Sequence, residues 1–309
     1  MNFFKPKFWD KNQISFFAIL LFPIALIINV FTLFKRTLAK YQKCMIPAIC
    51  VGNIYLGGTG KTPLCIEIFS ILKDLNMKPA FVRKKYNSFQ DETNLLKQTA
   101  PVYESNKRVD ALNNAIKDIA EIAVLDDGFQ DFSIKKDLSI ICFNEKQWIG
   151  NGFVVPAGPL RESVSALKRA DFVIKNGKKN AVIEKKILEK KNSIKIFYIQ
   201  YKALNIEKFK NNRILAFAGI GNPDNFFKLL NDNNIKIFEE KSFPDHYKYS
   251  DKELESLINK AEKNNVTLLT TEKDFFRIDE KKRKKINYLK IAVKLENKDH
   301  FINEIKKII

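Results

Sequence analysis

The sequence predicts an α/β protein with a doubly wound parallel sheet, a second, smaller α/β domain and an apolar N-terminal segment. Three observations support this fold class. Strand-like apolar runs alternate with helical patterns from about residue 46 onward, as a parallel sheet with crossover helices requires. The alternation restarts after about residue 171, and an uncharged stretch at residues 14–34 precedes both parts. A chain of 309 residues, 45% of them hydrophobic, suits two domains of ordinary size.

The uncharged stretch, ISFFAILLFPIALIINVFTLF, has the dimensions of a bilayer. A helix of that length spans about 30 Å, and its side chains are apolar on every side. Pro23 lies in its middle and is expected to kink or break a helix. Three alternatives stay open: a spanning helix, a helix or hairpin inserted from one side, and a buried core helix, with membrane contact favoured. Basic residues follow and predict that the rest of the chain stays in the cytoplasm; they are Lys35, Arg36, Lys40 and Lys43.

The first alternating part begins with a short apolar strand, IPAICVGNI, that ends in a glycine-rich turn. Helical spacing follows in TPLCIEIFSILKDLN and later in ALNNAIKDIA. Further strands are predicted in KPAFVRKKY, EIAVLDDG and LSIICFN. In the second part, ADFVIKNG and IKIFYIQYKAL are strand-like and are interpreted as a linker ribbon near residues 171–205. Three more strands then surround helices that begin near Pro223 and Ser250.

These patterns predict three regions. Residues 1–43 form the apolar membrane-associated segment, residues 44–175 a nucleotide-binding core, and residues 176–309 a C-terminal α/β domain.

Composition limits the function classes. The formal net charge of +19 favours anionic partners such as phosphorylated substrates or an acidic membrane surface, although Lys-rich solvated helices explain the excess equally well. No nucleic-acid-binding pattern accompanies the charge, so nucleic acid is not an expected partner. None of the four cysteines belongs to a C-x-x-C pair, and three lie in apolar contexts typical of buried structural thiols, which indicates a reducing compartment. Two histidines exclude a three-histidine metal site.

The segment VGNIYLGGTGKTP, residues 51–63, resembles a phosphate-binding loop between a strand and a helix. Gly57, Gly58 and Gly60 permit a close approach of the backbone to phosphate. Lys61 can reach the β- and γ-phosphates, and Thr62 can offer its hydroxyl to Mg²⁺. Tyr55 stands where the general pattern has its first glycine. The alternative, an ordinary glycine-rich turn, is weakened by the strand before the loop and the helix after it.

A second element supports a P-loop NTPase-like core. The apolar strand in IAEIAVLDDGFQ ends in Asp126 and Asp127. A carboxylate in this position binds Mg²⁺ directly or through water in P-loop proteins. An Asp-Gly turn that only ends a strand is the alternative, and the phosphate loop makes the metal role the better interpretation.

Six segments in one order over residues 51–278 make the chain resemble the tetraacyldisaccharide 4′-kinase family of lipid A synthesis. They are VGNIYLGGTGKTP, LDDGFQDFSIKKDLSI, GNGFVVPAGPLRES, FAGIGNPDNFF, FPDHYKYS and TTEKDFFRI. The family loop has the spacing G-N-x-x-x-G-G-T-G-K-T, so Asn53 and Thr59 join the expected ATP-binding residues and Tyr55 fits the family. The resemblance implies an ATP- and Mg²⁺-dependent kinase acting on the 4′-hydroxyl of a lipid A disaccharide 1-phosphate, yielding lipid IVA.

The resemblance also implies the catalytic groups. Asp91 in SFQDETNLL aligns with the family's acidic motif, whose Asp is taken as the base for the sugar hydroxyl. His246 in FPDHYKYS is expected to reach Asp91 from the second domain when a cleft closes. Arg161 in PAGPLRES is suited to phosphate oxygens of ATP or the transition state. Substrate contacts are expected from Arg83 and Tyr86, which carry over from a family strand end, and from Arg108 and Gln130 at the headgroup.

The expected partners are the acylated disaccharide 1-phosphate and the lipid surface at the cytoplasmic face of the bacterial inner membrane, with no obligatory protein partner evident. Two rival functions remain. One is a membrane-associated P-loop ATPase that switches partner binding, and the other is a kinase for a different membrane-bound sugar or polyprenol. Neither the PAGPLRES segment nor Asp91 with His246 is explained by the ATPase.

Overall fold

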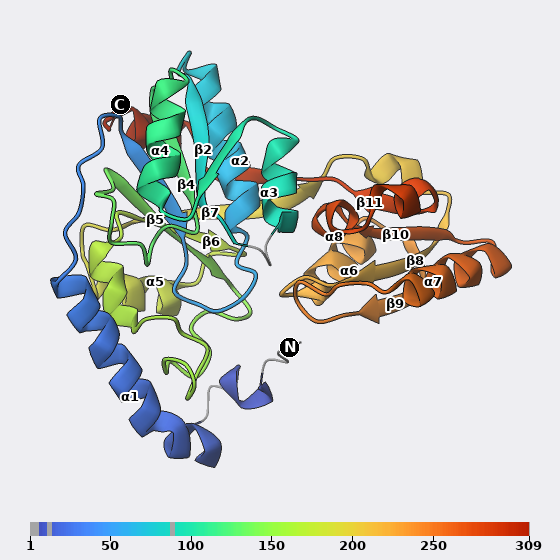
Figure 1. The fold of residues 1–309 in the computed structure, drawn as a ribbon. Coiled ribbons are helices and arrows are strands. Elements are labelled where there is room, and N and C mark those ends of the chain that lie inside the picture. The colour runs from blue at the N-terminus through green and yellow to red at the C-terminus, as the bar shows by residue number, and fades with distance from the viewer. Residues whose placement is uncertain (1–5, 11–13, 87–89, 309) are drawn as a thin grey trace. The chain divides into compact units, whose positions relative to one another are not determined.

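The computed structural model describes residues 6–10, 14–86 and 90–308, and of the expected N-terminal segment it therefore covers residues 6–10 and 14–43 (Figure 1). The strands are β1 (Ala48–Gly52), β2 (Pro79–Lys84), β3 (Val102–Ser105), β4 (Ile122–Asp126), β5 (Leu138–Asn144), β6 (Phe172–Asn176), β7 (Lys195–Ala203), β8 (Arg213–Ala218), β9 (Lys236–Ser242), β10 (Thr267–Thr271), β11 (Asn287–Leu289) and β12 (Ile291–Leu295).

The described α-helices are α1 (Phe16–Thr37), α2 (Lys61–Asp74), α3 (Gln90–Lys97), α4 (Arg108–Lys117), α5 (Ala181–Leu188), α6 (Pro223–Asp232), α7 (Asp251–Lys263), α8 (Glu272–Arg277) and α9 (Lys298–Lys306). Short 3₁₀ helices are η1 (Lys7–Trp9), η2 (Val164–Arg169), η3 (Ile206–Phe209) and η4 (Glu280–Lys285).

The chain divides into two compact units that each combine separate segments. Among the described residues, the larger unit consists of residues 6–10, 14–85, 100–200 and 295–308. Among the described residues, the smaller unit consists of Tyr86–Thr99 and Tyr201–Lys294. These units differ from the ranges 44–175 and 176–309 that the sequence suggests, because α3 belongs to the smaller unit and α9 to the larger one.

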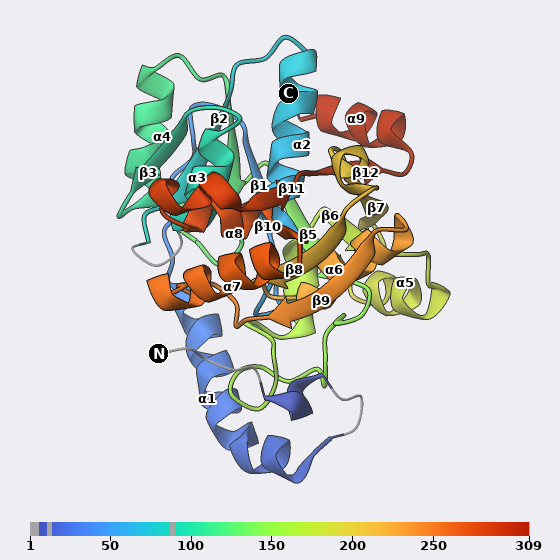
Figure 2. The same cartoon turned by 90° about the vertical axis from the view of Figure 1, so that its right-hand side faces the viewer.

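The strands β1 to β6 of the larger unit belong to an eight-stranded sheet in the order β12-β7-β6-β5-β1-β4-β2-β3. Every described pairing from β7 to β3 is parallel. All residues of β1, β4 and β5 are buried, as expected for parallel strands covered on both faces. Figure 2 shows α9 beside α2, where Lys298 Nζ lies 2.8 Å from Glu67 Oε1. The predicted doubly wound parallel fold is confirmed.

The two strand-like segments expected as a linker ribbon near residues 171–205 do not form a hairpin with each other. β6 pairs with β7 in parallel within the large sheet, and α5 connects the two strands. A parallel pair needs a crossover of about a dozen residues or more, usually a helix, whereas a ribbon needs only a tight turn. The Lys-rich segment between the two strands supplies that crossover.

The smaller unit is built on a four-stranded sheet in the order β11-β10-β8-β9, with the described pairings parallel. Alternate residues of β8 enter two different cores. Ile214 and Ala216 pack in a cluster with α6, and Leu215 and Phe217 pack in another with α7. Helices therefore cover both faces of this sheet. The helices expected near Pro223 and Ser250 are α6 and α7, and the Ser250 side chain caps α7 in a capping box.

The apolar N-terminal stretch is one helix, α1, of 22 residues. Ser15 caps it by accepting a hydrogen bond from the Ala18 N–H. Pro23 lies inside the helix without ending it, which differs from the expected break. Only 11% of its most apolar window is buried, and among the described residues α1 is the one helix long and apolar enough to cross a membrane. Its length of about 33 Å fits a hydrocarbon core of about 30 Å.

Candidate active site

The phosphate loop joins the buried strand β1 to the N-terminus of α2. Gly60 caps the helix with φ of +85°, a left-handed conformation that favours glycine. Asn53 stabilises the loop from inside, because its Nδ2 donates to Thr59 Oγ1 at 2.9 Å and to the Gly57 carbonyl at 3.2 Å. Lys61 is the first residue of α2 and is only 9% exposed. The loop is therefore held in shape by its own side chain and backbone.

Tyr55 fills the position of the glycine that the general pattern requires. Its side chain is fully buried and its hydroxyl donates to Asp10 Oδ1 at 2.5 Å. The backbone around it forms an isolated antiparallel bridge with Leu160. On either side, the Leu56 N–H donates to the Pro159 carbonyl at 2.8 Å and the Arg161 N–H to the Ile54 carbonyl at 2.7 Å. The entry of the loop is thus paired with the PAGPLRE segment, and this pairing positions Arg161.

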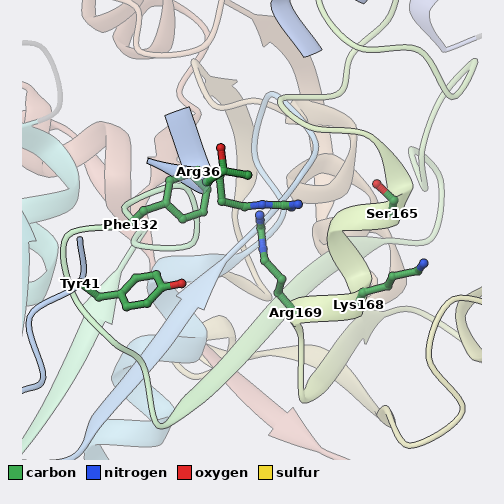
Figure 3. A pocket seen from close by; sticks show the side chains of 7 residues that line it. Arg36, Tyr41, Phe132, Ser165, Lys168 and Arg169 are labelled. Atoms are coloured by element: carbon green, nitrogen blue, oxygen red, sulfur yellow. The ribbon is translucent and has the colours of Figure 1, made fainter. Parts of the chain in front are cut away.

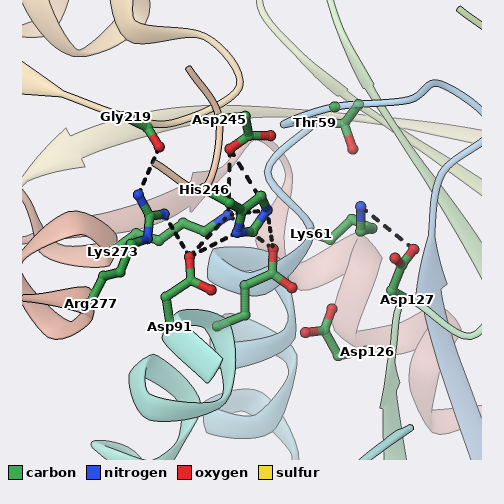
Figure 4. Close-up of polar contacts among 12 residues, drawn as sticks. Thr59, Lys61, Asp91, Asp126, Asp127, Gly219, Asp245, His246, Lys273 and Arg277 are labelled. Atoms are coloured by element: carbon green, nitrogen blue, oxygen red, sulfur yellow. Dashed lines mark hydrogen bonds and ion pairs between the residues drawn. The ribbon is translucent and has the colours of Figure 1, made fainter. Parts of the chain in front are cut away.

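The carboxyl end of β4 places Asp126 and Asp127 next to the loop, because β4 pairs with β1 in parallel. Asp127 has φ of +52°. Its Oδ1 lies 3.5 Å from Lys61 Nζ (Figure 4). Both of its oxygens lie 3.0 Å from Arg161 Nη1. Burial opposes ionisation of Asp127, but Lys61 and Arg161 outweigh it and hold the pKa of this carboxyl well below its ordinary value.

Asp126 is more deeply enclosed than Asp127. It is 1% exposed, and its Oδ2 lies 3.3 Å from Arg83 Nε. Cys65 Sγ donates to its Oδ1 at 3.6 Å. Arg83 is itself only 3% exposed, so the structure places it against the acidic strand end.

The oxygen donors at this strand end suit Mg²⁺. Within residues 6–10, 14–86 and 90–308, no three His, Cys, Asp or Glu side chains are grouped to hold a metal ion. Two adjacent carboxylates and the Thr62 hydroxyl are nevertheless the partial oxygen set that Mg²⁺ uses together with substrate phosphates and water. The residues present therefore fit a magnesium ion that arrives with a nucleotide.

Arg108 does not present its charge to solvent, in contrast to the expected headgroup contact. It is 2% exposed and donates to Asp131 Oδ2 at 2.8 Å and to the Asp126 and Asp127 carbonyls at 3.0 and 3.1 Å. It therefore fixes the acidic turn. Gln130 likewise supports the loop, because its Nε2 donates to the Asn53 carbonyl at 2.9 Å. Arg108 and Gln130 therefore stabilise the acidic turn and the phosphate loop.

A second cluster lies in the smaller unit and contains Asp91 and His246. Asp91 stands in the first turn of α3 and is 3% exposed. His246 Nδ1 lies 3.1 Å from Asp91 Oδ2, and the His246 backbone has φ of +57° (Figure 4). From the sequence, Asp91 is expected in the first domain and His246 is expected to reach it when a cleft closes. The structure groups both in one compact unit, so their contact needs no closure.

Lys273 and Arg277 complete this cluster and were missed by the sequence analysis. Arg277 Nη2 donates to Asp91 Oδ2 at 2.6 Å. Lys273 Nζ lies 3.0 Å from Glu92 Oε1, 3.3 Å from His246 Nε2 and 3.7 Å from Asp91 Oδ2. The signal was present in TTEKDFFRI, because residues four apart share one face of a helix. That spacing puts both cations on the same side of α8.

The charges of this second cluster reinforce one another. Burial opposes ionisation of Asp91, but His246, Lys273 and Arg277 outweigh it and hold the pKa of Asp91 far below its ordinary value. Burial also opposes the charge of Lys273, yet Glu92, Asp245 and Asp91 raise the pKa of Lys273 above its ordinary value. Asp91 is therefore an ionised, nearly enclosed carboxylate at neutral pH. Tyr86, the last described residue before α3, is 41% exposed.

The cysteines carry no nucleophilic chemistry. Cys50, Cys65 and Cys142 are buried, and burial raises the pKa of Cys50 to about 11 and that of Cys142 to about 12. Thiols with such pKa values stay protonated at neutral pH. The structure thus agrees with the expectation of structural thiols.

Known proteins match this chain over nearly its whole length. The family model described as tetraacyldisaccharide-1-P 4′-kinase matches residues 17–309. A protein of Pelagibacter ubique named tetraacyldisaccharide 4′-kinase is 40% identical over 100% of this chain and 99% of its own length. A Rickettsia bellii protein of the same name is 33% identical over 88% of this chain and 89% of its own.

A solved structure agrees in fold. LpxK of Aquifex aeolicus, described as an "apo" form in complex with ATP, superposes with a TM-score of 0.72 at 23% identity and covers 94% of this chain and 99% of its own. The family model spans both the phosphate loop and the Asp91–His246 cluster, and the curated relatives carry the same name. The chain therefore belongs to the tetraacyldisaccharide-1-phosphate 4′-kinase family.

Proposed function

We propose that this chain is an ATP-dependent kinase that phosphorylates the 4′-hydroxyl of a tetraacyldisaccharide 1-phosphate to give lipid IVA. The observation that carries the proposal is the end-to-end match to a relative named for this activity, over 100% of this chain and 99% of the relative. The two polar clusters suit the two halves of the reaction. One cluster offers a phosphate loop with cations, and the other offers an ionised carboxylate with a histidine.

The donor half is assigned to the larger unit. The phosphates of ATP bind the loop residues Asn53, Gly57, Gly58, Thr59, Gly60, Lys61 and Thr62. Support comes from α2, whose first N–H groups have no partners within the helix and point into the loop at its positive end. Asn53 keeps that loop in shape through Thr59 and Gly57.

Asp127 prepares the cations for the nucleotide. Its carboxylate contacts both Lys61 and Arg161. The incoming phosphate oxygens replace that carboxylate on the two cations, and Arg161 then contacts the transferred group. Asp127, together with Asp126 and Thr62, would hold Mg²⁺. The metal ion supplies neutralisation of the charge on the β- and γ-phosphates.

The acceptor half is assigned to the smaller unit. Asp91 accepts the proton of the 4′-hydroxyl while that oxygen bonds to the γ-phosphorus and the bond from phosphorus to ADP breaks. A carboxylate with a lowered pKa is a weak base, but phosphoryl transfer has a loose transition state in which the proton moves late. His246 holds Asp91 in position, and Lys273 and Arg277 keep it ionised.

Of the four substrate contacts expected from sequence, Tyr86 keeps a direct role in this proposal. Its side chain is 41% exposed and could contact a sugar ring. Arg83, Arg108 and Gln130 act indirectly, because each supports the acidic turn or the loop.

The acylated substrate places the enzyme at a membrane. α1 enters the bilayer from the cytoplasmic side of the inner membrane, and Lys35 and Arg36 in its last turn stay in the cytoplasm. Its large side chains are exposed nearly all round; Phe16, Ile27 and Phe31, for example, are 74%, 69% and 64% exposed. Removing such side chains from water contributes about 25 cal/mol per Å².

The test is transfer of ³²P from γ-labelled ATP to a tetraacyldisaccharide 1-phosphate in detergent micelles. Wild-type protein is expected to label the lipid, and Lys61→Met and Asp91→Asn to lose labelling by about 10²-fold or more. Lys73→Met, at the exposed end of the same helix α2, is the matched control and keeps full activity. ATP hydrolysis without any labelled lipid would instead establish the rival membrane-associated ATPase.

A further inference from the structure

A basic pocket lies at the C-terminal end of α1, and none of the residues assigned to the reaction lines it. Its volume is about 500 Å³, and it is lined by Arg36, Thr37, Tyr41, Phe132, Ser165, Lys168 and Arg169. Three of these side chains are cations, three carry hydroxyl groups and none is a carboxylate. Figure 3 shows the ends of Arg36 and Arg169 turned toward each other. Two facing cations repel each other, so such a lining favours an anion between them.

Arg169 is a preorganised part of this pocket. Its Nη2 donates to both Glu162 oxygens at 2.9 Å, and its guanidinium lies 4.5 Å from the Phe129 ring centre and 5.1 Å from that of Phe132. Its Nη1 is buried and finds no hydrogen-bond acceptor in the part of the chain that the structure describes. The Arg169 side chain is thus fixed at the wall of the pocket and remains 24% exposed.

Arg36 and Lys168 are available to the same ligand. Neither side chain forms a hydrogen bond or ion pair with any of the described residues. Arg36 belongs to the last turn of α1 and Lys168 to η2, so the ligand would be held from two elements. Bidentate guanidinium groups are well matched to phosphate oxygens.

The position of the pocket identifies the source of the phosphate. α1 is apolar and exposed along 22 residues and ends at Thr37, which lines the pocket. A bilayer that covers α1 brings its phosphate groups to the level of that end. Tyr41 is 64% exposed beside the pocket, and aromatic residues of this kind favour the headgroup region. We infer that the pocket binds the phosphate group of an anionic phospholipid of the membrane.

The inference rests on the membrane association proposed for α1, and it is tested by lipid binding rather than by kinase activity. The full-length protein is equilibrated in nonionic micelles that contain phosphatidylglycerol and phosphatidylcholine in equal small amounts, and retained lipids are counted by native mass spectrometry. Nonionic micelles carry no surface potential, so the general attraction of basic residues to a charged membrane does not contribute. Phosphatidylglycerol is expected to be retained in preference to phosphatidylcholine.

Two double variants distinguish lipid binding in this pocket from general attraction to basic residues nearby. Arg36→Gln with Lys168→Gln removes two lining cations that have no partners among the described residues, so the fold is expected to persist. Lys35→Gln with Lys40→Gln removes the same charge from exposed residues at the same end of α1 that do not line the pocket. The first pair is expected to weaken phosphatidylglycerol binding at least about tenfold, and the second to leave it unchanged.

Three results would overturn the inference. In the first, the Arg36→Gln, Lys168→Gln variant binds phosphatidylglycerol as well as wild type does. In the second, both double variants lose binding equally. In the third, inorganic phosphate binds the pocket as tightly as the lipid does. The last result assigns the pocket to a free anion. Failure of α1 to hold the protein on vesicles is measured separately by flotation, and it tests the membrane proposal itself.

Discussion

We expect Lys273 to determine which nitrogen of a neutral His246 ring carries the proton. Its Nζ lies 3.3 Å from His246 Nε2 and 3.0 Å from Glu92 Oε1. An ammonium group can only donate hydrogen bonds, and neighbouring carboxylates raise the pKa of Lys273 against the effect of burial. The Nε2 atom must therefore accept. The proton of the neutral ring then sits on Nδ1, 3.1 Å from Asp91 Oδ2.

The magnitude follows from one charged hydrogen bond. A bond with an ionised donor contributes about 1.5–3 kcal/mol, and each 1.4 kcal/mol is a factor of about ten in population. Lys273→Met therefore weakens the preference for the Nδ1–H form by about 10- to 150-fold. If catalysis uses that form, kcat falls by up to the same factor. KM for ATP is unchanged, because Lys273 belongs to the smaller unit and the phosphate loop to the larger one.

The sequence makes the assay simple, because His246 and His300 are the only histidines. Protein labelled with ¹⁵N-histidine gives two imidazole patterns, and His300→Asn assigns them. Lys273→Met is expected to move the His246 proton toward Nε2 and to lower kcat, whereas Lys273→Arg preserves the donor and most of the activity. Lys252→Met, exposed in the same unit, is the matched control. A Lys273→Met protein with an unchanged tautomer and full kcat would refute the reasoning.

Three other changes test the larger unit. Gly60→Ala places a side chain at φ of +85° and is expected to destabilise the loop by about 1–2 kcal/mol, measured as weaker ATP binding by calorimetry; unchanged affinity would contradict the left-handed cap. Tyr55→Phe removes the hydroxyl donated to Asp10 and is expected to cost about 1 kcal/mol in urea unfolding. Because the pKa of Asp127 is lowered on folding, its contribution to stability is present above about pH 4 and is lost as the pH falls below that value. Asp127→Asn should therefore reduce the dependence of the unfolding free energy on pH below pH 4 by up to about 1.4 kcal/mol per pH unit. Unfolding is followed by the fluorescence of the two tryptophans, which lie in this unit. An unaltered slope would show that Asp127 is not held ionised.

The predictable parts of the site are those whose residues are adjacent in sequence. The phosphate loop follows a strand and opens a helix, so Gly60 and Lys61 could be placed from the local pattern alone. Asp126 and Asp127 end a buried strand, and parallel pairing brings that end to the loop. Local rules of turns, caps and strand ends decide these positions.

Contacts between distant segments could not be predicted in the same way. Arg277 meets Asp91 across 186 residues of sequence because α3 packs on α8. The bridge between Tyr55 and Leu160 has no local signal either. Arg108 shows a further limit, because sequence gives the sign of a charge but not its burial. A cation that suits a ligand by type is instead bonded to the backbone of the acidic turn.

The two clusters place a carboxylate among cations in the same way but with opposite consequences. Asp127, with Lys61 and Arg161, is 23% exposed, and Arg161 is 27% exposed, so an incoming phosphate can replace the carboxylate on these cations. The Asp91 side chain is 2% exposed and that of Arg277 is 10% exposed, so this carboxylate is less open to an incoming anion. Removing one partner of a buried charge pair typically costs about 3–5 kcal/mol. The first arrangement therefore suits exchange of one anion for another, whereas the second keeps the proposed base ionised and in place until the hydroxyl proton is transferred to it.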